Sequence, residues 1–400
     1  MSTAPDLRIL TINGGSSSLK FAIYEMGLTE RVAARGEAQR IGLSGSSIAA
    51  WDGAGGQLLS RTVDLADHRV ALNVLFDWLD ERRLSTALSA VGHRVVHGGT
   101  RFAQPHRVDA DVLAELRRLA GLDPTHLPQE IAGIEAVGER LPALAQVVCF
   151  DTAFHRGMPA VAQRYALPRA LTDEGVIRYG FHGLSYEFVV EELKRLGGER
   201  GVPGRILVAH LGNGASMAAV RDGKGIETTM GFTPAGGLVM STRCGDIDPG
   251  VALYLLRDKQ LSPAAYGKLI NHQAGMLGVS ETSGDVRDLL AAEATDPRAA
   301  EALALFCYQA TKFIGALVAA LGGLDVLVFT AGIGEHSPAV RERICDGLGF
   351  LGVRLDRGRN QAGATVISAD ESAVTVRVIK TNEELMIARH TGAVLRAGTA

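Results

Sequence analysis

The sequence has no dense block of positive charge and very little cysteine. Lysine and arginine number 41 against 44 aspartate and glutamate residues, which gives a formal net charge of −3. A protein that neutralises a nucleic-acid backbone needs clustered basic side chains, so a nucleic-acid partner is not expected. The cysteines stand far apart, with no Cys-x-x-Cys pair and no histidine at metal-ligand spacing, so we expect reduced thiols. They are Cys149, Cys244, Cys307 and Cys345.

Signals for export and membrane insertion are also missing. Residues 1–10 carry charged side chains among few apolar ones, so they lack the uninterrupted apolar core of a signal peptide. The most apolar stretch, residues 313–334, is broken by two glycines and Asp325 into pieces too short to span a bilayer. We interpret it as a buried helix followed by a buried strand, and we expect a cytoplasmic protein without a membrane partner.

Neither of the two commonest phosphate-binding signatures occurs. The chain contains no Gly-x-x-x-x-Gly-Lys-Ser/Thr loop, and it lacks the glycine-rich, His-Arg-Asp and Asp-Phe-Gly set of protein kinases. A nucleotide would therefore have to bind on a different fold.

An internal repeat is the first positive signal. The chain has 400 residues, 46% of them hydrophobic, which favours two domains over one. Residues 9–23 and 206–220 resemble each other: each has an apolar β-rich run, a turn dense in Gly, Ser or Asn, and a second apolar run. This is the pattern of a strand, a tight turn and a strand. It predicts two similar halves that face each other.

Strands and long helices are mixed along the rest of the chain, which indicates α/β architecture. Thr381 and Glu384 have capping-box spacing, so they predict that a last helix starts there. Residues 42–56 are rich in Gly and Ser without a sustained period and are interpreted as a surface stretch. Further strands are predicted at 90–96, 145–150, 326–330 and 374–379, and helices at 110–120, 185–196 and 300–321.

Three glycine-rich turns could hold phosphate groups, at residues 13–18, 210–216 and 331–337. Without a Cβ in the way, several backbone N–H groups of such a turn can converge on one anion. A single turn of this kind is more often plain turn chemistry. Three of them, two related by the internal repeat, favour a phosphate-binding cleft between the two halves.

Six segments stand out along the chain: Asn13-Gly-Gly-Ser-Ser-Ser-Leu-Lys20, Gly92-His-Arg-Val-Val-His-Gly98, Phe150-Asp-Thr-Ala-Phe-His155, Tyr179-Gly-Phe-His-Gly183, His210-Leu-Gly-Asn-Gly214 and Thr381-Asn-Glu-Glu384. In this order they resemble the acetate kinase family of short-chain carboxylate kinases. The resemblance covers nearly the whole chain and implies a duplicated ribonuclease-H-like fold with an interdomain cleft, shared with sugar kinases, actin and heat-shock chaperones. It implies domains at 1–151 plus 385–400 for the acceptor and at 152–384 for the nucleotide.

The family resemblance implies reversible, in-line phosphoryl transfer from ATP to acetate, with Mg²⁺ or Mn²⁺, in a homodimer. Such a transfer needs positive charge around the reacting phosphoryl group, and an acceptor carboxylate is already ionised at neutral pH. Arginine supplies a planar, permanently charged fork that matches both carboxylate and phosphate. By resemblance the catalytic residues are Asp151, Arg94, His182 and Arg243.

The remaining site residues are also carried over from the family. Asn13 and Glu383 would hold the metal, whereas Glu384 is interpreted as the third residue of the capping box. Arg94, Val96, Thr125, Phe181 and Pro234 would form the acceptor pocket. The nucleotide would contact Lys20, His210, Leu211, Gly212, Asn213, Gly214, Asp285, Val286, Arg287, Gly332, Ile333, Gly334, Glu335 and His336.

Several exchanges leave alternatives open. Thr125 stands where the family usually has leucine, and one methylene in an apolar pocket changes binding by only about 1–3 kcal/mol, so propionate or butyrate could be the acceptor instead. His336 replaces an asparagine near the adenine and bears on nucleotide preference. A chaperone-like or actin-like ATP-binding protein would use the same cleft without forming an acyl phosphate, and a sugar kinase would need a polar sugar site. Other departures are Leu184, Tyr186, Gly236, Ser241, Cys244 and Lys380.

Overall fold

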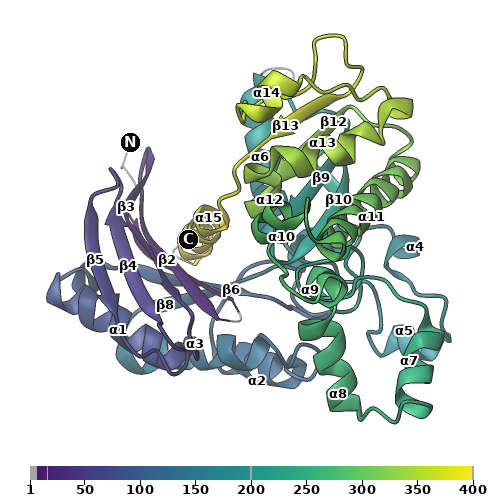
Figure 1. Ribbon diagram of the computed structural model, residues 1–400. Coiled ribbons are helices and arrows are strands. Elements are labelled where there is room, and N and C mark those ends of the chain that lie inside the picture. Colours follow the sequence, from purple (N-terminus) through teal and green to yellow (C-terminus); the bar gives the residue numbers. More distant parts are fainter. Residues whose placement is uncertain (1–6, 16, 199–200, 399–400) are drawn as a thin grey trace. The chain divides into compact units, whose positions relative to one another are not determined.

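The computed structural model describes residues 7–15, 17–198 and 201–398. Ser16, which belongs to the first predicted glycine-rich turn, lies outside the described residues. The chain forms two compact units, each built on a sheet of its own (Figure 1). Unit 1 comprises Met1–Ala153 and Asn382–Ala400, and unit 2 comprises Phe154–Thr381.

An eight-stranded mixed sheet forms the centre of unit 1, in the order β5-β4-β3-β2-β1-β6-β8-β7. β1 is antiparallel to β2 and parallel to β6, which is parallel to β8. The C-terminal ends of β1, β6 and β8 therefore meet at one edge of the sheet. The strands are β1 (Leu7–Gly14), β2 (Ser18–Met26), β3 (Glu30–Gln39), β4 (Ser47–Asp52), β5 (Gln57–Thr62), β6 (Ala90–Val95), β7 (His106–Arg107) and β8 (Ala145–Phe150).

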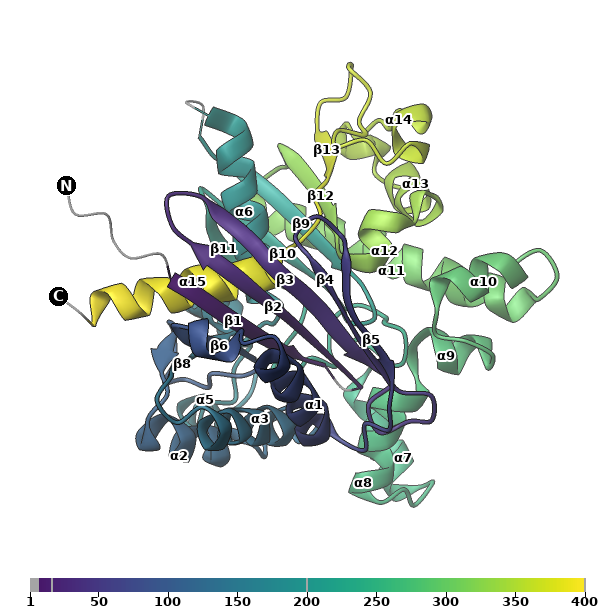
Figure 2. The same cartoon turned by 90° about the vertical axis from the view of Figure 1, so that its left-hand side faces the viewer.

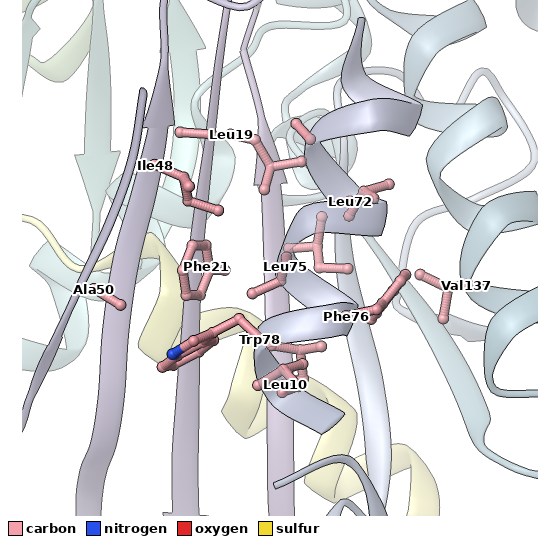
Figure 3. Close-up of a cluster of buried hydrophobic side chains, with 14 of the residues drawn as sticks. Leu10, Leu19, Phe21, Ile48, Ala50, Leu72, Leu75, Phe76, Trp78 and Val137 are labelled. Carbon is pink, nitrogen blue, oxygen red and sulfur yellow. The ribbon is translucent and has the colours of Figure 1, made fainter. Parts of the chain in front are cut away.

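Helices cover both faces of this sheet because its central strands are apolar on both sides. Leu10 and Phe21 pack against Trp78 and other residues of α1, and Val137 of α3 joins the same cluster (Figure 3). The opposite face of β1 and β2, which includes Ile9, packs against α15, and Figure 2 shows this helix running across these strands. The helices of unit 1 are α1 (His68–Glu81), η1 (Ser85–Ala87), α2 (Ala110–Leu119), α3 (Leu127–Arg140) and α15 (Glu383–Ala397).

The last helix approaches the sheet closely at Gly92 of β6. A Cβ atom on Gly92 would lie 2.3 Å from Thr391 Oγ1 and 2.6 Å from Ile387 Cγ2, closer than real side chains allow. Glycine is therefore required at this position for α15 to pack against β6.

Unit 2 has a five-stranded sheet in the order β11-β10-β9-β12-β13. Val189 of α6 packs against Val208 and Val328 in one core cluster, and α11 packs against β9, β10 and β11. The strands are β9 (Arg205–Leu211), β10 (Ala215–Arg221), β11 (Lys224–Thr228), β12 (Val326–Thr330) and β13 (Thr375–Val378). The first helix after the boundary is η2 (Ala153–Gly157), which begins at the last residue of the first segment of unit 1. The other helices are α4 (Ala160–Gln163), α5 (Arg169–Asp173), α6 (Gly183–Gly197), α7 (Pro249–Arg257), α8 (Pro263–Lys268), η4 (Leu269–Gln273), α9 (Gly275–Ser280), α10 (Val286–Ala292), α11 (Pro297–Leu321), α12 (Ala331–His336), α13 (Pro338–Asp346), η5 (Gly349–Leu351) and α14 (Arg357–Gln361).

The two sheets repeat one topology, which explains the repeat in the sequence. In unit 1 the order β3-β2-β1-β6-β8 has three antiparallel neighbours followed by two parallel strands, and β11-β10-β9-β12-β13 follows the same rule in unit 2. The repeated segments are the hairpins β1-β2 and β9-β10. The predicted α/β class with a duplicated ribonuclease-H-like unit is confirmed.

Three local predictions are wrong. Residues 42–56 contain β4, whose Ile48 and Ala50 are buried at alternate positions, so the Gly and Ser content concealed a strand. In the turn predicted at residues 331–337, Ala331–His336 form the short helix α12. The N-cap of α15 is Asn382, whose side chain accepts from the N–H of Leu385, so Thr381 and Glu384 do not form a capping box.

Helix α11 is the one helix in the described residues that is long and apolar enough to cross a membrane by length and composition. Its buried side chains include Leu303, Phe306, Ile314 and Leu317, and they recur at helical spacing along one face. Together with the strand β12 that follows, it matches the predicted buried helix and buried strand. We therefore interpret α11 as the core helix of unit 2.

Candidate active site

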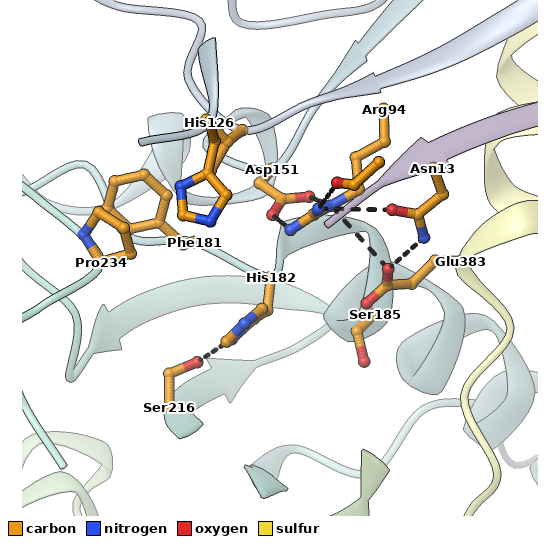
Figure 4. Close-up of polar contacts among 12 residues, drawn as sticks. Asn13, Arg94, His126, Asp151, Phe181, His182, Ser185, Ser216, Pro234 and Glu383 are labelled. Carbon is orange, nitrogen blue, oxygen red and sulfur yellow. Dashed lines mark hydrogen bonds and ion pairs between the residues drawn. The ribbon is translucent and has the colours of Figure 1, made fainter. Parts of the chain in front are cut away.

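The carboxyl edge of the unit 1 sheet holds a buried ion pair. Arg94, near the end of β6, donates from Nε to Oδ1 of Asp151 at 3.0 Å and from Nη2 to Oδ2 at 2.5 Å. Asp151 follows β8 directly and is fully buried, and the Arg94 side chain is 14% exposed. The parallel pairing of β6 with β8 brings these two residues together (Figure 4). The pair fixes the plane of the guanidinium group.

The same edge gathers two further carboxylates around Asn13. Its Nδ2 donates to Glu383 Oε2 and Glu384 Oε1, each at 3.1 Å, and its Oδ1 accepts from Arg94 Nη1 at 3.4 Å. Glu383 Oε2 also lies 4.0 Å from Arg94 Nε. The role assigned to Glu384 as a helix-capping residue is wrong, because its carboxylate turns to Asn13.

Two of the residues predicted for the acceptor pocket, Val96 and Thr125, belong to unit 1. Val96 follows β6 and is buried, and Thr125 is half-buried with its N–H donated to Asp123 Oδ1 at 3.1 Å. The N–H of Val96 donates to Glu130 Oε2 at 3.0 Å. Glu130 lies outside the six segments that carry the family resemblance, so the sequence did not identify this contact. Lys20 is exposed on β2, opposite Asn13 in the strand register.

In unit 2 a hydrogen-bonded chain orients His182. The residue caps the N-terminus of α6 with a left-handed φ of 60°, and its Nδ1 lies 2.8 Å from Ser216 Oγ. Ser216 is also hydrogen-bonded to the Tyr186 hydroxyl. The imidazole ring of His182 stacks on the ring of His210, with the ring centroids 4.0 Å apart. These contacts hold the imidazole in place. The backbone of His182 has a left-handed conformation that is uncommon for residues other than glycine.

Gly214 lies where His182 and Arg243 come together. A Cβ atom on Gly214 would be 3.3 Å from His182 Nε2 and 3.5 Å from Arg243 Nη1. Arg243 Nη1 is held by the carbonyl oxygen of Pro234 at 3.1 Å. The missing side chain of Gly214 thus leaves space beside an imidazole and a guanidinium group, which can surround an anion.

Buried His155 supports this arrangement and was missed as a functional candidate. Burial lowers its pKa to about 4, so the ring is neutral, and Nε2 donates to the carbonyl oxygen of Phe181 at 3.0 Å. Gly180, with a φ of 73°, would contact the His155 ring at 2.6 Å if it had a Cβ. His155 therefore holds the backbone that leads into His182.

A cavity of about 750 Å³ in unit 2 is large enough for a nucleotide. Eight of the predicted nucleotide residues line it: Gly212, Asn213, Asp285, Val286, Arg287, Gly332, Ile333 and His336. Eight others were not predicted: Ser241, Thr242, Gly284, Leu290, Ser337, Pro338, Ala339 and Gln361. His210, Leu211, Gly214, Gly334 and Glu335 are not among its lining residues.

Glu335 points its carboxylate at backbone N–H groups. Oε1 accepts from Ala331 at 2.9 Å and from Thr381 at 3.0 Å. Ala331 has a φ of 64°, which is strained for a residue with a Cβ. Buried Arg341 donates to the carbonyl oxygens of Gly334 and Glu335 at 2.9 Å. These two side chains stabilise the strained start and the end of α12 beside the cavity.

Comparisons with known proteins agree on one family. The model of the Acetokinase family matches residues 8–389. The chain belongs to the acetokinase family. It is 45% identical to the acetate kinase of Rhodopseudomonas palustris strain TIE-1 over 387 residues, which are 96% of this chain and 97% of that one.

Solved structures of acetokinase-family proteins are similar over their whole length. The acetate kinase of Porphyromonas gingivalis has a TM-score of 0.85 and 38% identity, covering 97% of this chain and 100% of that one. A propionate kinase from Francisella tularensis subsp. tularensis SCHU S4 has a TM-score of 0.90 and 35% identity, covering 96% and 98%. Family membership favours a kinase over a chaperone-like or actin-like protein.

None of the departures from the acetokinase pattern replaces Arg94, His182 or Arg243. Tyr186 takes part in the chain that holds His182, and Ser241 donates its hydroxyl to the carbonyl oxygen of Gly284 at 2.6 Å beside the cavity. The side chain of His336 is 75% exposed on the cavity wall. A Cβ atom on Gly236 would lie 3.3 Å from Asp246 Oδ1, so a larger residue would have to displace that carboxylate.

Proposed function

We propose that this protein transfers the terminal phosphoryl group of ATP to acetate, forming acetyl phosphate and ADP in a reversible, in-line reaction. The observation that carries the proposal is the buried guanidinium of Arg94, held flat by Asp151 at the edge of the unit 1 sheet. Two of its five N–H groups bind Asp151, and Nη1 donates to Asn13 Oδ1 and to the carbonyl oxygen of Gly14, which leaves one N–H of Nη2 for an acceptor carboxylate. We assign the acceptor role to unit 1 and the nucleotide role to unit 2.

The acceptor carboxylate needs charge compensation more than a general base. It is ionised at neutral pH, so the obstacle to reaction is repulsion between two anions. Arg94 offsets the charge of the acceptor, and Asp151 orients Arg94 instead of removing a proton. His182 and Arg243, beside the open space at Gly214, stabilise the equatorial oxygens of the transferring phosphoryl group.

A divalent cation such as Mg²⁺ fits the carboxylates next to Asn13. Among the described residues no cluster of three or more His, Cys, Asp or Glu side chains could form a complete metal site. Mg²⁺ accepts this arrangement because it binds one or two carboxylates and completes its shell with water and phosphate oxygens. Glu383 would hold it, with Glu384 nearby and Asn13 positioning both carboxylates. The ion would supply charge neutralisation on the nucleotide phosphates.

The test of this function is formation of an acyl phosphate, trapped as the hydroxamate by hydroxylamine. With Mg²⁺ and ATP, acetate should give the highest kcat/KM among acetate, propionate, butyrate and glycerol, and glycerol should give none. Excess EDTA should abolish the signal, and added Mg²⁺ should restore it. A higher kcat/KM with propionate would favour the second candidate, a propionate kinase, which the similarity to the Francisella structure supports and the exchange at Thr125 leaves open. ATP hydrolysis without any hydroxamate would contradict both.

We also propose that two copies of the chain associate through α7. No residue of this helix is buried, and Leu253 is 65% and Tyr254 47% exposed, with Ile247 and Val251 also exposed nearby. An apolar patch of this kind is typical of a protein interface. Sedimentation velocity should give a dimer for the wild type and monomers for Leu253→Glu. Leu28→Glu, which changes a 99% exposed leucine of unit 1, should stay dimeric. A monomeric wild type at micromolar concentration would contradict the proposal.

The cytoplasm is the compartment that we propose for this enzyme. None of the four cysteines forms a disulfide in the part of the chain that the structure describes, and three of them are buried. Free thiols persist in a reducing compartment.

A further inference from the structure

Glu130 is a buried carboxyl group that the proposed mechanism does not use. It lies in the first turn of α3 and is 8% exposed. Its Oε2 accepts the N–H of Val96 at 3.0 Å, and its Oε1 is buried without a hydrogen-bond partner among the described residues. Val96 comes two residues after Arg94, so Glu130 holds the segment that carries the acceptor arginine.

A small cavity connects Glu130 with the surroundings of Arg94. Its volume is about 20 Å³, enough for one water molecule. Arg94, Gly14 and Gln129 line it together with Glu130. The same cavity thus borders the acceptor arginine and the glycine-rich end of β1.

The charged and titratable groups around Glu130 come from several elements. Arg94 attracts a negative charge on Glu130, whereas Asp151 and Asp123 repel it. His93 also borders the cavity, and burial lowers its pKa to about 4, so it contributes no charge at neutral pH. His68 of α1 borders the cavity with Nε2 placed 2.8 Å from the carbonyl oxygen of Gly15, and His126 is paired with Asp123. Among these groups Arg94 alone is permanently positive, and it is already paired with Asp151.

The neutral form of Glu130 is favoured by this environment. Burial raises its pKa to about 8, and Arg94 and the N–H of Val96 offset only part of that effect. An ionised oxygen without a partner is far more costly to bury than a neutral one. The burial of Glu130 and the lack of a hydrogen-bond partner for Oε1 among the described residues both favour the neutral state.

We propose that Glu130 is a positioning residue of the acceptor site that acts in its neutral form. It fixes the backbone at Val96 and leaves the positive charge of Arg94 to the substrate carboxylate. This inference rests on the proposed function. Loss of the proton would add a further negative charge near Arg94, beside those of Asp151 and Glu383, and weaken binding of any anionic acceptor.

The first test is the pH dependence of KM for acetate. For the wild type, KM should rise by about tenfold between pH 7 and pH 9, while KM for ATP changes little, because only the neutral form of Glu130 permits tight acetate binding. Glu130→Gln, which keeps an acceptor for Val96 but cannot ionise, should lose this rise and show less than a twofold change. Glu135→Gln is the matched control, since Glu135 lies on the same helix in a surface ion pair with Arg117. It should behave like the wild type.

The second test is thermal stability and needs no activity. Between the pKa of an ordinary glutamate and about 8, Glu130 keeps its proton in the folded state and releases it in the unfolded state. The free energy of unfolding of the wild type therefore falls as pH rises through this range. The Tm of Glu130→Gln minus that of the wild type should therefore increase from pH 5 to pH 8. If the glutamine variant does not fold, Glu130→Leu should show the same trend.

The possible outcomes separate the two proposals. A wild type without acetate-dependent hydroxamate overturns the proposed function, while the thermal test still decides whether Glu130 is neutral. An active wild type whose rise in KM persists in Glu130→Gln, or a Tm difference that does not grow with pH, overturns the role of Glu130.

Discussion

Replacing Arg94 by alanine should raise KM for acetate by about 10²-fold, with a much smaller change in KM for ATP. Truncating one partner of a buried, hydrogen-bonded charge pair typically costs about 2–5 kcal/mol, and each 1.4 kcal/mol is about a factor of ten in affinity. Arg94 makes two hydrogen bonds to Asp151, which is fully buried, and would also hold the acceptor. Steady-state kinetics with each substrate varied in turn would measure the KM for acetate and the KM for ATP.

The same variant should be destabilised, because Asp151 would be left as a buried charge without Arg94. A loss on this scale is about 3–5 kcal/mol in the free energy of unfolding, measurable by urea denaturation. Arg61→Ala is the control, because Arg61 forms an exposed ion pair with Glu81 in the same unit and should change stability by less than about 1 kcal/mol. Unchanged acetate kinetics in Arg94→Ala would refute the acceptor assignment.

Replacing Arg243 by alanine should lower kcat by about 10²-fold or more and leave KM for ATP nearly unchanged. A cation that acts mainly on the developing charge of the transition state contributes to turnover more than to substrate binding. Arg243 is held by the carbonyl oxygen of Pro234 beside Gly214, and it is not among the residues that line the large cavity of unit 2. Single-turnover and steady-state rates would separate chemistry from product release.

Arg205→Ala provides the matched control for Arg243. Arg205 lies in the same unit and pairs with Asp325 at the surface, so its removal should leave kcat unchanged. A large rise in KM for ATP with normal kcat in Arg243→Ala would instead place Arg243 in nucleotide binding.

Local hydrophobic pattern predicted most of the fold. The repeated hairpins, the strands at 90–96, 145–150 and 326–330 and the helix at 300–321 are present, because each buries apolar residues at its own period. The strand β4 was missed because only Ile48 and Ala50 point inward within a stretch of Gly and Ser. The cap of α15 was misassigned because Thr381 is engaged through its N–H by Glu335, from a distant part of the chain.

Sequence motifs predicted the reactive side chains of the candidate site but not the residues that hold them. Arg94, His182 and Gly214 stand in recognisable segments. Glu130 and His155 act on backbone groups of Val96 and Phe181, which pairing and packing bring to them. His155 ends one of the recognisable segments, but the segment alone does not show that its ring holds a backbone carbonyl. Glu130 lies outside all six segments, and a backbone N–H partner leaves no signature in the residue type at Val96.

The position of α15 has a consequence for how the protein is made. Its residues complete unit 1, although 228 residues of unit 2, Phe154–Thr381, are synthesised in between. Ile387 and Thr391 pack against Gly92, and Glu383 joins Asn13 and Arg94 only when these last segments leave the ribosome. A chain cut short before residue 382 would therefore keep all of unit 2 and lack the carboxylate proposed for the metal. Synthesis through α15 is thus a condition for assembling the proposed acceptor site.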